Sequence, residues 1–324
     1  TVVINTGKSP FVPGIDGEPG LRAAPHLTYK SFWHLARLPV VTLVLGAGFV
    51  GLELGQGLAR LGSEVHFIER ADRPIPRVTP DISEILKDAL TADGAIFHFG
   101  ATAAQVDHDE QTRTFTVHLE SGETLEGQAL LVSAGRRSNT AALNASAGEV
   151  ALADHGNVVV DEHLRTSCEG VYAIGDVTGQ PAFTHVSWED YRRIKAILDG
   201  EARTQMDRVL GYSLFTEPQV AQAGLTLAQA EDKGYDAREA TMPLSDTARA
   251  SEIGRTRGLY RMVIDRETDA ILGATLVGPN TAELIHVFIA HIEAGSTWQR
   301  LDQSVHIHPT FAESLPTLAR RFAD

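Results

Sequence analysis

The 324-residue sequence contains a single cysteine, Cys168, so no disulfide can form within it. This scarcity fits a reducing compartment, and we expect a cytoplasmic protein. Basic residues are also few: 28 Lys and Arg stand against 42 Asp and Glu, and the net charge of −14 argues against a nucleic-acid partner. No run approaches about 18 apolar residues, so we expect no membrane span.

The amino terminus lacks both an initiator Met and a charged leader with a cleavage site. We therefore expect no signal peptide, and residue 1 need not be the natural start. What is present is ordinary for a globular protein: 43% hydrophobic and 22% charged residues, in a chain long enough for two or three domains.

The stretch VVTLVLGAGFVGLELGQGLARLGSEVHFIE, from Val40 to Glu69, predicts a strand, a glycine turn, a helix and a second strand. Residues 41–45 are predominantly apolar, as in a parallel strand that is covered on both faces. Leucines recur along the expected helix, and Gly62 ends it. The stretch therefore predicts one βαβ unit.

Gly46, Gly48 and Gly51 form a GxGxxG pattern in the turn of this unit. The first glycine allows a tight turn, the second lets a pyrophosphate approach the backbone, and the third allows close packing of helix and strand. The helix N-terminus attracts the phosphates, and Glu69 is placed to accept hydrogen bonds from a ribose. We expect a dinucleotide site; the alternative is a purely structural glycine turn.

Two carboxylates near this turn, Glu69 and Glu53, each allow two interpretations. Glu69 favours NADH because it repels a 2′-phosphate, whereas Arg70 and Arg73 oppose that preference. Glu53, which we expect in the first turn of the helix, is either a carboxylate interacting with the helix dipole or a residue near the nicotinamide.

Two stretches form a weak internal repeat: VVINTGKSP at 2–10 and LLVSAGRRSN at 130–139. Each is an apolar strand followed by a small residue, Gly, a basic residue and, soon after, Ser. By analogy, the first copy closes an earlier nucleotide domain whose glycine turn lies before residue 1. The alternative is that a strand followed by Gly and a basic residue is a common exit from any α/β sheet.

The remaining elements suggest a loop-rich segment and an α+β terminal part. We expect a helix at 80–90, strands within 99–133, two short strands around turns in GNVVVDEHLRTSCEGVYAIGDVTG, and a helix at 187–199. Residues 257–278 predict a hairpin. Residues 281–295 predict an amphipathic helix with five apolar side chains inward: Leu284, Ile285, Phe288, Ile289 and Ile292.

Asp176, which follows Gly175 at the end of an apolar run, is a candidate acceptor for a sugar-like polyol, or else an aspartate turn or helix cap. We interpret Cys168 as an inert, half-buried residue.

His306 and His308 alternate as in a strand and could share a face, but they have no matching ligand set, so we expect no metal site. We interpret His308 with Glu313 as an imidazole that a carboxylate orients for acid–base chemistry.

These ordered motifs resemble the pyridine nucleotide-disulfide oxidoreductases, such as dihydrolipoamide dehydrogenase, glutathione reductase and mercuric reductase, over essentially the whole chain. The stretches INTG, WEDYRRI and MPLSDTARA look most like the hypothiocyanous acid reductase branch. The resemblance implies an α/β fold with two Rossmann-like dinucleotide-binding domains, the first incomplete, and a C-terminal α+β dimerisation domain. It divides the chain into an FAD-domain remnant and linker (1–38), an NAD(P)H domain (39–139), a second FAD segment (140–205) and an interface domain (206–324).

The resemblance also implies roles for particular residues. Phe49 gates the nicotinamide pocket, Glu53 lies beside nicotinamide and flavin, and Asp176 binds the flavin ribityl chain. His308 and Glu313 form a dyad that reaches the partner subunit's flavin and thiol in a homodimer. The implied cofactor-binding residues are Thr6, Gly7, Gly46, Gly48, Phe49, Gly51, Glu69, Gly135, Gly175, Asp176, Thr184 and His185.

The sequence departs from the family in lacking the first glycine turn, the redox cysteine pair and the lysine that pairs with the Glu53 position. We therefore expect the later part of an enzyme that passes hydride from NAD(P)H to FAD and on to a disulfide or related small-molecule acceptor. The alternatives are an NAD(P)H-binding remnant, a flavin-only oxidase or diaphorase, and a protein that the cell makes in a longer form.

Overall fold

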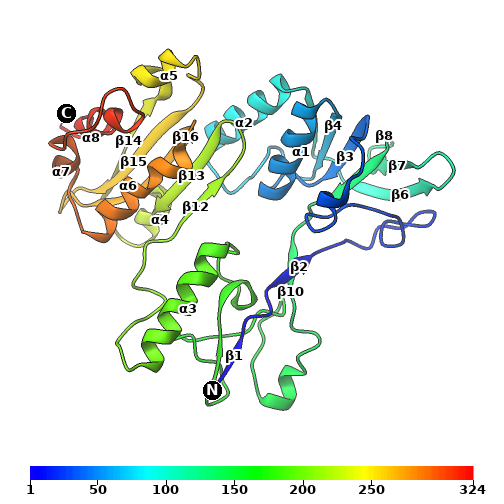
Figure 1. Cartoon of the computed structure of the whole chain (residues 1–324), viewed down its shortest axis with the longest axis horizontal. Coiled ribbons are helices and arrows are strands. Elements are labelled where there is room, and N and C mark those ends of the chain that lie inside the picture. Colours follow the sequence, from blue (N-terminus) through cyan, green and yellow to red (C-terminus); the bar gives the residue numbers. More distant parts are fainter. Residues whose placement is uncertain (324) are drawn as a thin grey trace. The chain divides into compact units, whose positions relative to one another are not determined.

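The computed structural model describes residues 1–323, and Figure 1 shows its helices and strands. The strands are β1 Val2–Ile4, β2 Lys8–Pro10, β3 Val41–Leu45, β4 Glu64–Glu69, β5 Ala95–Phe99, β6 Ala103–Asp109, β7 Thr114–Leu119, β8 Thr124–Gly127, β9 Ala129–Val132, β10 Arg136–Ser138, β11 Val171–Ala173, β12 Gly211–Leu214, β13 Gln219–Gly224, β14 Ala237–Pro243, β15 Leu259–Asp265 and β16 Ile271–Gly278. The α-helices are α1 Phe49–Leu61, α2 Pro80–Ala92, α3 Thr184–Leu198, α4 Leu227–Asp232, α5 Ala248–Glu252, α6 Thr281–Glu293, α7 Trp298–Asp302 and α8 Leu315–Arg320.

The chain folds into two compact units. The first comprises residues 1–13 and 134–208, and the second comprises residues 14–133 and 209–323. In the part of the chain that the structure describes, every helix is too short or too polar to cross a lipid bilayer.

In the first unit the two copies of the sequence repeat pair with each other. Strand β2 of the first copy lies antiparallel to β10 of the second, with Ser9 opposite Arg137. The glycine that precedes each strand has a positive φ, +65° at Gly7 and +111° at Gly135. Both copies therefore use glycine for the same left-handed turn, as their shared pattern requires.

The rest of the first unit is short strands and one long helix. Strand β1 pairs in parallel with β11, and α3 begins at Thr184, slightly before the expected residue 187. Two short strands were expected in residues 156–179. One of them is β11, but the other, around residues 157–160, is absent. There the amides of Val158 and Val159 donate to different segments, at Val177 and Ala151, so no continuous ladder forms.

The second unit contains the predicted βαβ motif. Strands β5, β4, β3 and β9 form a parallel sheet in that order. Helix α1 packs closely on β4: a Cβ added at Gly55 would lie 2.4 Å from the ring of Phe67. The left-handed Gly62 (φ +106°) caps α1, as its position predicted. Strands β6, β7 and β8 form a separate antiparallel sheet.

The C-terminal part of the second unit is an antiparallel sheet, in the order β12, β13, β16, β15, β14, with α6 against β13 and β16. The predicted hairpin is β15–β16, and the predicted helix is α6, with Leu284, Ile285 and Phe288 buried and its other inward residues partly buried against the same core. A second core lies between the parallel sheet and the C-terminal antiparallel sheet, since Leu131 of β9 and Val220 of β13 belong to the same buried cluster. The mixed α/β fold class is confirmed.

Candidate functional site

The glycine turn between β3 and α1 has the geometry of a phosphate-binding turn. Gly46 has a φ of +100°, and its carbonyl accepts a hydrogen bond from Ser133 Oγ at 2.9 Å. A Cβ at Gly51 would lie 2.2 Å from the Gly46 oxygen, so only glycine fits there. A Cβ at Gly48 would meet nothing within 4 Å. The backbone is therefore open at Gly48, beside the α1 N-terminus, as a pyrophosphate-binding turn requires.

Glu69, at the end of β4, is held against this turn. Its Oε2 accepts the Ala47 amide at 2.7 Å, and its Oε1 accepts the Ala71 amide at 3.0 Å. The sequence indicated a ribose contact for Glu69, but it gave no sign of these two backbone contacts. They fix the carboxylate beside the dinucleotide turn, and this arrangement fits a nicotinamide dinucleotide.

The two arginines that follow Glu69 differ in their surroundings. Arg73 donates to Asp72 Oδ1 at 3.1 Å and to the Pro76 carbonyl at 3.3 Å, whereas the Arg70 side chain is exposed. Arg70 is therefore the better placed of the two to oppose the preference of Glu69 for NADH.

Glu53 lies in the second turn of α1, so the expectation that it sits in the first turn is wrong. Its position weakens the helix-dipole interpretation, because that effect falls off within one turn. Glu53 Oε1 accepts the Phe215 amide at 2.8 Å, and burial raises the pKa of this carboxyl although that hydrogen bond opposes the shift. Phe49, at the start of α1, contacts the Tyr212 ring at 5.3 Å between centroids.

Replacing Glu53 with Gln is expected to change how stability depends on pH. A raised pKa means that the folded state binds the proton more tightly, so wild-type stability falls as pH rises from about 4.5 through the folded-state pKa. E53Q keeps an oxygen for the Phe215 amide but loses this dependence. We expect it to match the wild type near pH 4 and exceed its stability at pH 7.5, in denaturant unfolding at both pH values. A difference in unfolding free energy between E53Q and wild type that stays constant with pH would contradict the burial effect.

In the first unit, Gly175 and Asp176 follow β11 after one intervening residue, Ile174. Gly175 has a φ of +69°, and a Cβ there would lie 2.6 Å from Ser187 Oγ and 2.8 Å from Asn5 Oδ1. Asp176 Oδ2 lies 3.3 Å from Arg136 Nη1, and its side chain is 21% exposed. A partly exposed carboxylate on a tightly packed glycine turn fits the binding of a flavin polyol chain.

The other predicted flavin contacts also belong to the first unit. Asn139 donates its backbone amide to the Gly7 carbonyl at 3.0 Å and its side-chain amide to the Thr6 carbonyl at 2.9 Å. Thr184 and His185 are exposed in the first turn of α3. The structure therefore places the predicted flavin residues in one unit and the glycine turn with Glu69 in the other.

His308 and Glu313 are joined by a 2.7 Å contact between Nδ1 and Oε2. The His308 side chain is 72% exposed and that of Glu313 is 19% exposed. The expected strand at His306 and His308 is wrong: these residues are irregular coil, and His306 Nε2 instead contacts Ser304 Oγ at 2.9 Å. Among residues 1–323, no group of three or more His, Cys, Asp or Glu side chains is suited to a metal ion.

Comparisons with known proteins agree with this geometry. Residues 1–190 match the family described as pyridine nucleotide-disulphide oxidoreductase, and residues 211–319 match its dimerisation domain. A mercuric reductase of Staphylococcus aureus is 33% identical over 99% of this chain and 58% of its own length. A probable pyridine nucleotide-disulfide oxidoreductase of Escherichia coli, RclA, is 32% identical over 98% of this chain and 71% of its own length.

A solved structure with the same architecture is the HOCl-induced flavoprotein disulfide reductase RclA from Escherichia coli. It superposes with a TM-score of 0.89 at 32% identity and covers 98% of this chain and 72% of that one. The chain spans just under three fifths of the length of the mercuric reductases of Staphylococcus aureus and Lysinibacillus sphaericus, 58% in each case.

Proposed function

Because the chain belongs to the pyridine nucleotide-disulphide oxidoreductase family, whose cofactors are FAD and NAD(P)H, we propose that it serves the NAD(P)H-dependent reduction of a disulfide or a related acceptor. The observation that carries this proposal is the glycine turn, left open at Gly48 and lined by the fixed carboxylate of Glu69. When bound, the flavin supplies two-electron transfer between nicotinamide and acceptor.

The chain's own residues bind and orient the two cofactors in this proposal. Gly46, Gly48, Gly51 and Glu69 hold the dinucleotide, with Phe49 and Glu53 at the nicotinamide end. Thr6, Gly7, Gly135, Gly175, Asp176, Thr184 and His185 hold the flavin. The proposed division is 1–38 and 140–205 for FAD, 39–139 for NAD(P)H and 206–324 for the interface.

At the acceptor end, His308, oriented by Glu313, exchanges a proton with a thiol. A redox disulfide needs two cysteines, and these 324 residues contain one, so we propose that the complete protein supplies them. The family's dimerisation domain supports a homodimer, and the exposed His308 imidazole suits a role across the subunit interface. We propose a cytoplasmic location without nucleic-acid or membrane partners.

The second candidate is a flavin-only NAD(P)H oxidase or diaphorase, which needs no cysteine pair. The single Cys168 favours it. The 2.7 Å contact between His308 and Glu313 favours disulfide chemistry instead, because an oxidase has no thiol to protonate.

An absorbance spectrum recorded with the intact mass of the same sample tests the proposal directly. We expect flavin bands at about one flavin per chain in the purified protein, bleached by NADH or NADPH without oxygen. A colourless protein that still binds NADH would instead indicate a dinucleotide-binding remnant.

A further inference from the structure

We propose that the buried ion pair between Asp190 and Arg208 is a positioning device for flavin binding, because it fixes the turn that carries Asp176. This inference rests on the proposed function, since it assumes that Asp176 contacts the flavin. It assigns a role to two buried residues that would act only through this turn.

The pair is almost completely withdrawn from solvent. The Asp190 side chain is 0% exposed and that of Arg208 is 5% exposed, and Oδ1 of the aspartate lies 2.7 Å from Nη1 of the arginine. Asp190 Oδ2 accepts the Gly175 amide at 2.8 Å and the Gln180 side-chain amide at 3.1 Å. Arg208 also donates to Gln180 Oε1, so the three side chains Asp190, Gln180 and Arg208 form a closed ring of contacts.

This arrangement gives the buried amide of Gly175 its acceptor. A buried amide without a partner is costly, and here the acceptor comes from α3, 15 residues along the chain. A side chain at Gly175 is also excluded, because Ser187 and Asn5 occupy the space where its Cβ would lie. The 3-10 turn Gly175–Thr178 starts at this residue, so the position of Gly175 sets the direction of the Asp176 side chain.

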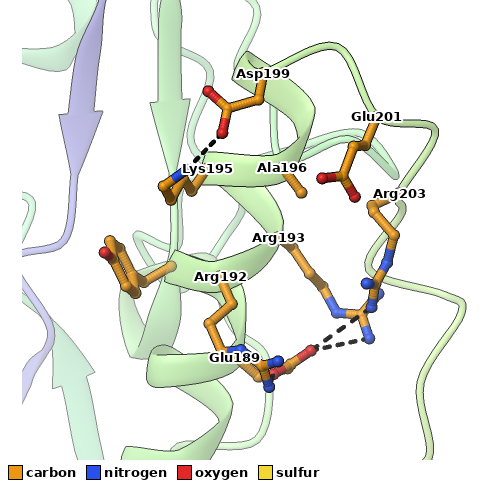
Figure 2. Close-up of a pocket in the computed structure, with 9 residues that line it drawn as sticks. Glu189, Arg192, Arg193, Lys195, Ala196, Asp199, Glu201 and Arg203 are labelled. Carbon is orange, nitrogen blue, oxygen red and sulfur yellow. Dashed lines mark hydrogen bonds and ion pairs between the residues drawn. The ribbon is translucent and has the colours of Figure 1, made fainter.

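The segment that carries Arg208 is itself fixed to α3. Arg193 donates to the Thr204 carbonyl at 2.6 Å and pairs with Asp207 and, at 3.1 Å, with Glu189. Figure 2 shows that Glu189 contacts both Arg193 and Arg203, whereas Lys195 contacts Asp199. Arg208 therefore reaches Asp190 from a segment that other contacts already hold in place.

Burying two charges costs free energy that their attraction only partly offsets, so such a pair is weak as a device for stability alone. Its hydrogen bonds instead converge on one turn. The predicted consequence is specific: losing the acceptor for Gly175 weakens flavin binding even where the fold survives. Binding of NAD(P)H involves the other unit and is expected to be unchanged.

Two charge-free double variants of the complete protein separate these effects. D190N/R208Q retains an amide oxygen for Gly175, whereas D190L/R208M removes the acceptor and replaces the pair with apolar side chains, which folds tolerate in other buried pairs. We expect the FAD dissociation constant to rise about tenfold or more in D190L/R208M and to stay within about threefold of wild type in D190N/R208Q. K195Q, at an exposed position of α3, serves as the surface control.

Equal FAD affinity in the two double variants would overturn the positioning role, whereas wild-type protein that binds no flavin would overturn the proposed function itself. Hydrogen exchange tests the premise of the proposal, the hydrogen bond from Gly175 to Asp190, without any variant. We expect the Gly175 amide of wild-type protein stripped of flavin to exchange slowly, and exchange as fast as that of a solvent-exposed turn would also overturn the proposal.

Discussion

Replacing Gly51 with Ala is expected to abolish measurable NAD(P)H binding and to destabilise the second unit. The new Cβ would lie 2.2 Å from the Gly46 carbonyl oxygen and 2.7 Å from Ser133 Oγ. The nearer atom belongs to the backbone, so relief requires the start of α1 to move away from β3. Such overpacking costs about 1–3 kcal/mol of stability. The same movement displaces the helix N-terminus from the phosphates, as titration with NADH and NADPH and denaturant unfolding will measure.

Two other glycines of the same segment provide matched controls. G57A adds a Cβ where nothing lies within 4 Å, on an exposed part of α1, and is expected to stabilise the helix by about 1 kcal/mol without affecting binding. G48A is equally uncrowded in the protein but places its methyl where we propose that the pyrophosphate binds, so we expect normal stability with weak binding. Wild-type NADH affinity in G48A would show that this turn does not hold the phosphates.

The apolar patterning of the sequence made part of the fold predictable. The order of strand, turn and helix follows from local apolar patterning, and β3, α1 and β4 appear where this patterning indicated. The C-terminal hairpin and α6 were predictable for the same reason. Side-chain periodicity reports which face of an element is buried, and both elements bury a continuous face.

Contacts between distant segments were not predictable in this way. The Phe215 amide reaches Glu53 from 162 residues away, and the sequence carries no signal for a contact made by a backbone atom. The Glu69 contact with the Ala47 amide, 22 residues away, is of the same kind.

Local patterning also failed where a strand lacks a neighbour. Residues 157–160 read as a β-strand, and His306 with His308 alternates like one, but a strand exists only where another segment pairs with it continuously. The glycine turn and the contact between His308 and Glu313 follow from local sequence, whereas the backbone partners of Glu53 and Glu69 are decided by the tertiary fold.

Replacing His308 with Gln is expected to lower the turnover of a disulfide acceptor about 100-fold or more in the complete protein, the range typical for the loss of a general acid–base group. His308 Nδ1 contacts Glu313 Oε2 at 2.7 Å, which leaves Nε2 to exchange a proton with a thiol. Reduction of the flavin by NAD(P)H needs no such proton exchange. We therefore expect stopped-flow flavin reduction to proceed at the wild-type rate while the thiol-forming steady-state rate falls.

The neighbouring residues show whether the effect belongs to this pair. H306Q alters a nearby histidine that contacts only Ser304 among the hydrogen bonds found in residues 1–323, and it should leave both rates unchanged. E313Q keeps a hydrogen-bonding group beside His308 Nδ1 but removes the carboxylate charge, so we expect a smaller loss than in H308Q, confined to the same thiol step. If H308Q slows flavin reduction and disulfide turnover equally, the imidazole acts on folding or cofactor binding, and the assignment of His308 as the acid–base residue is wrong.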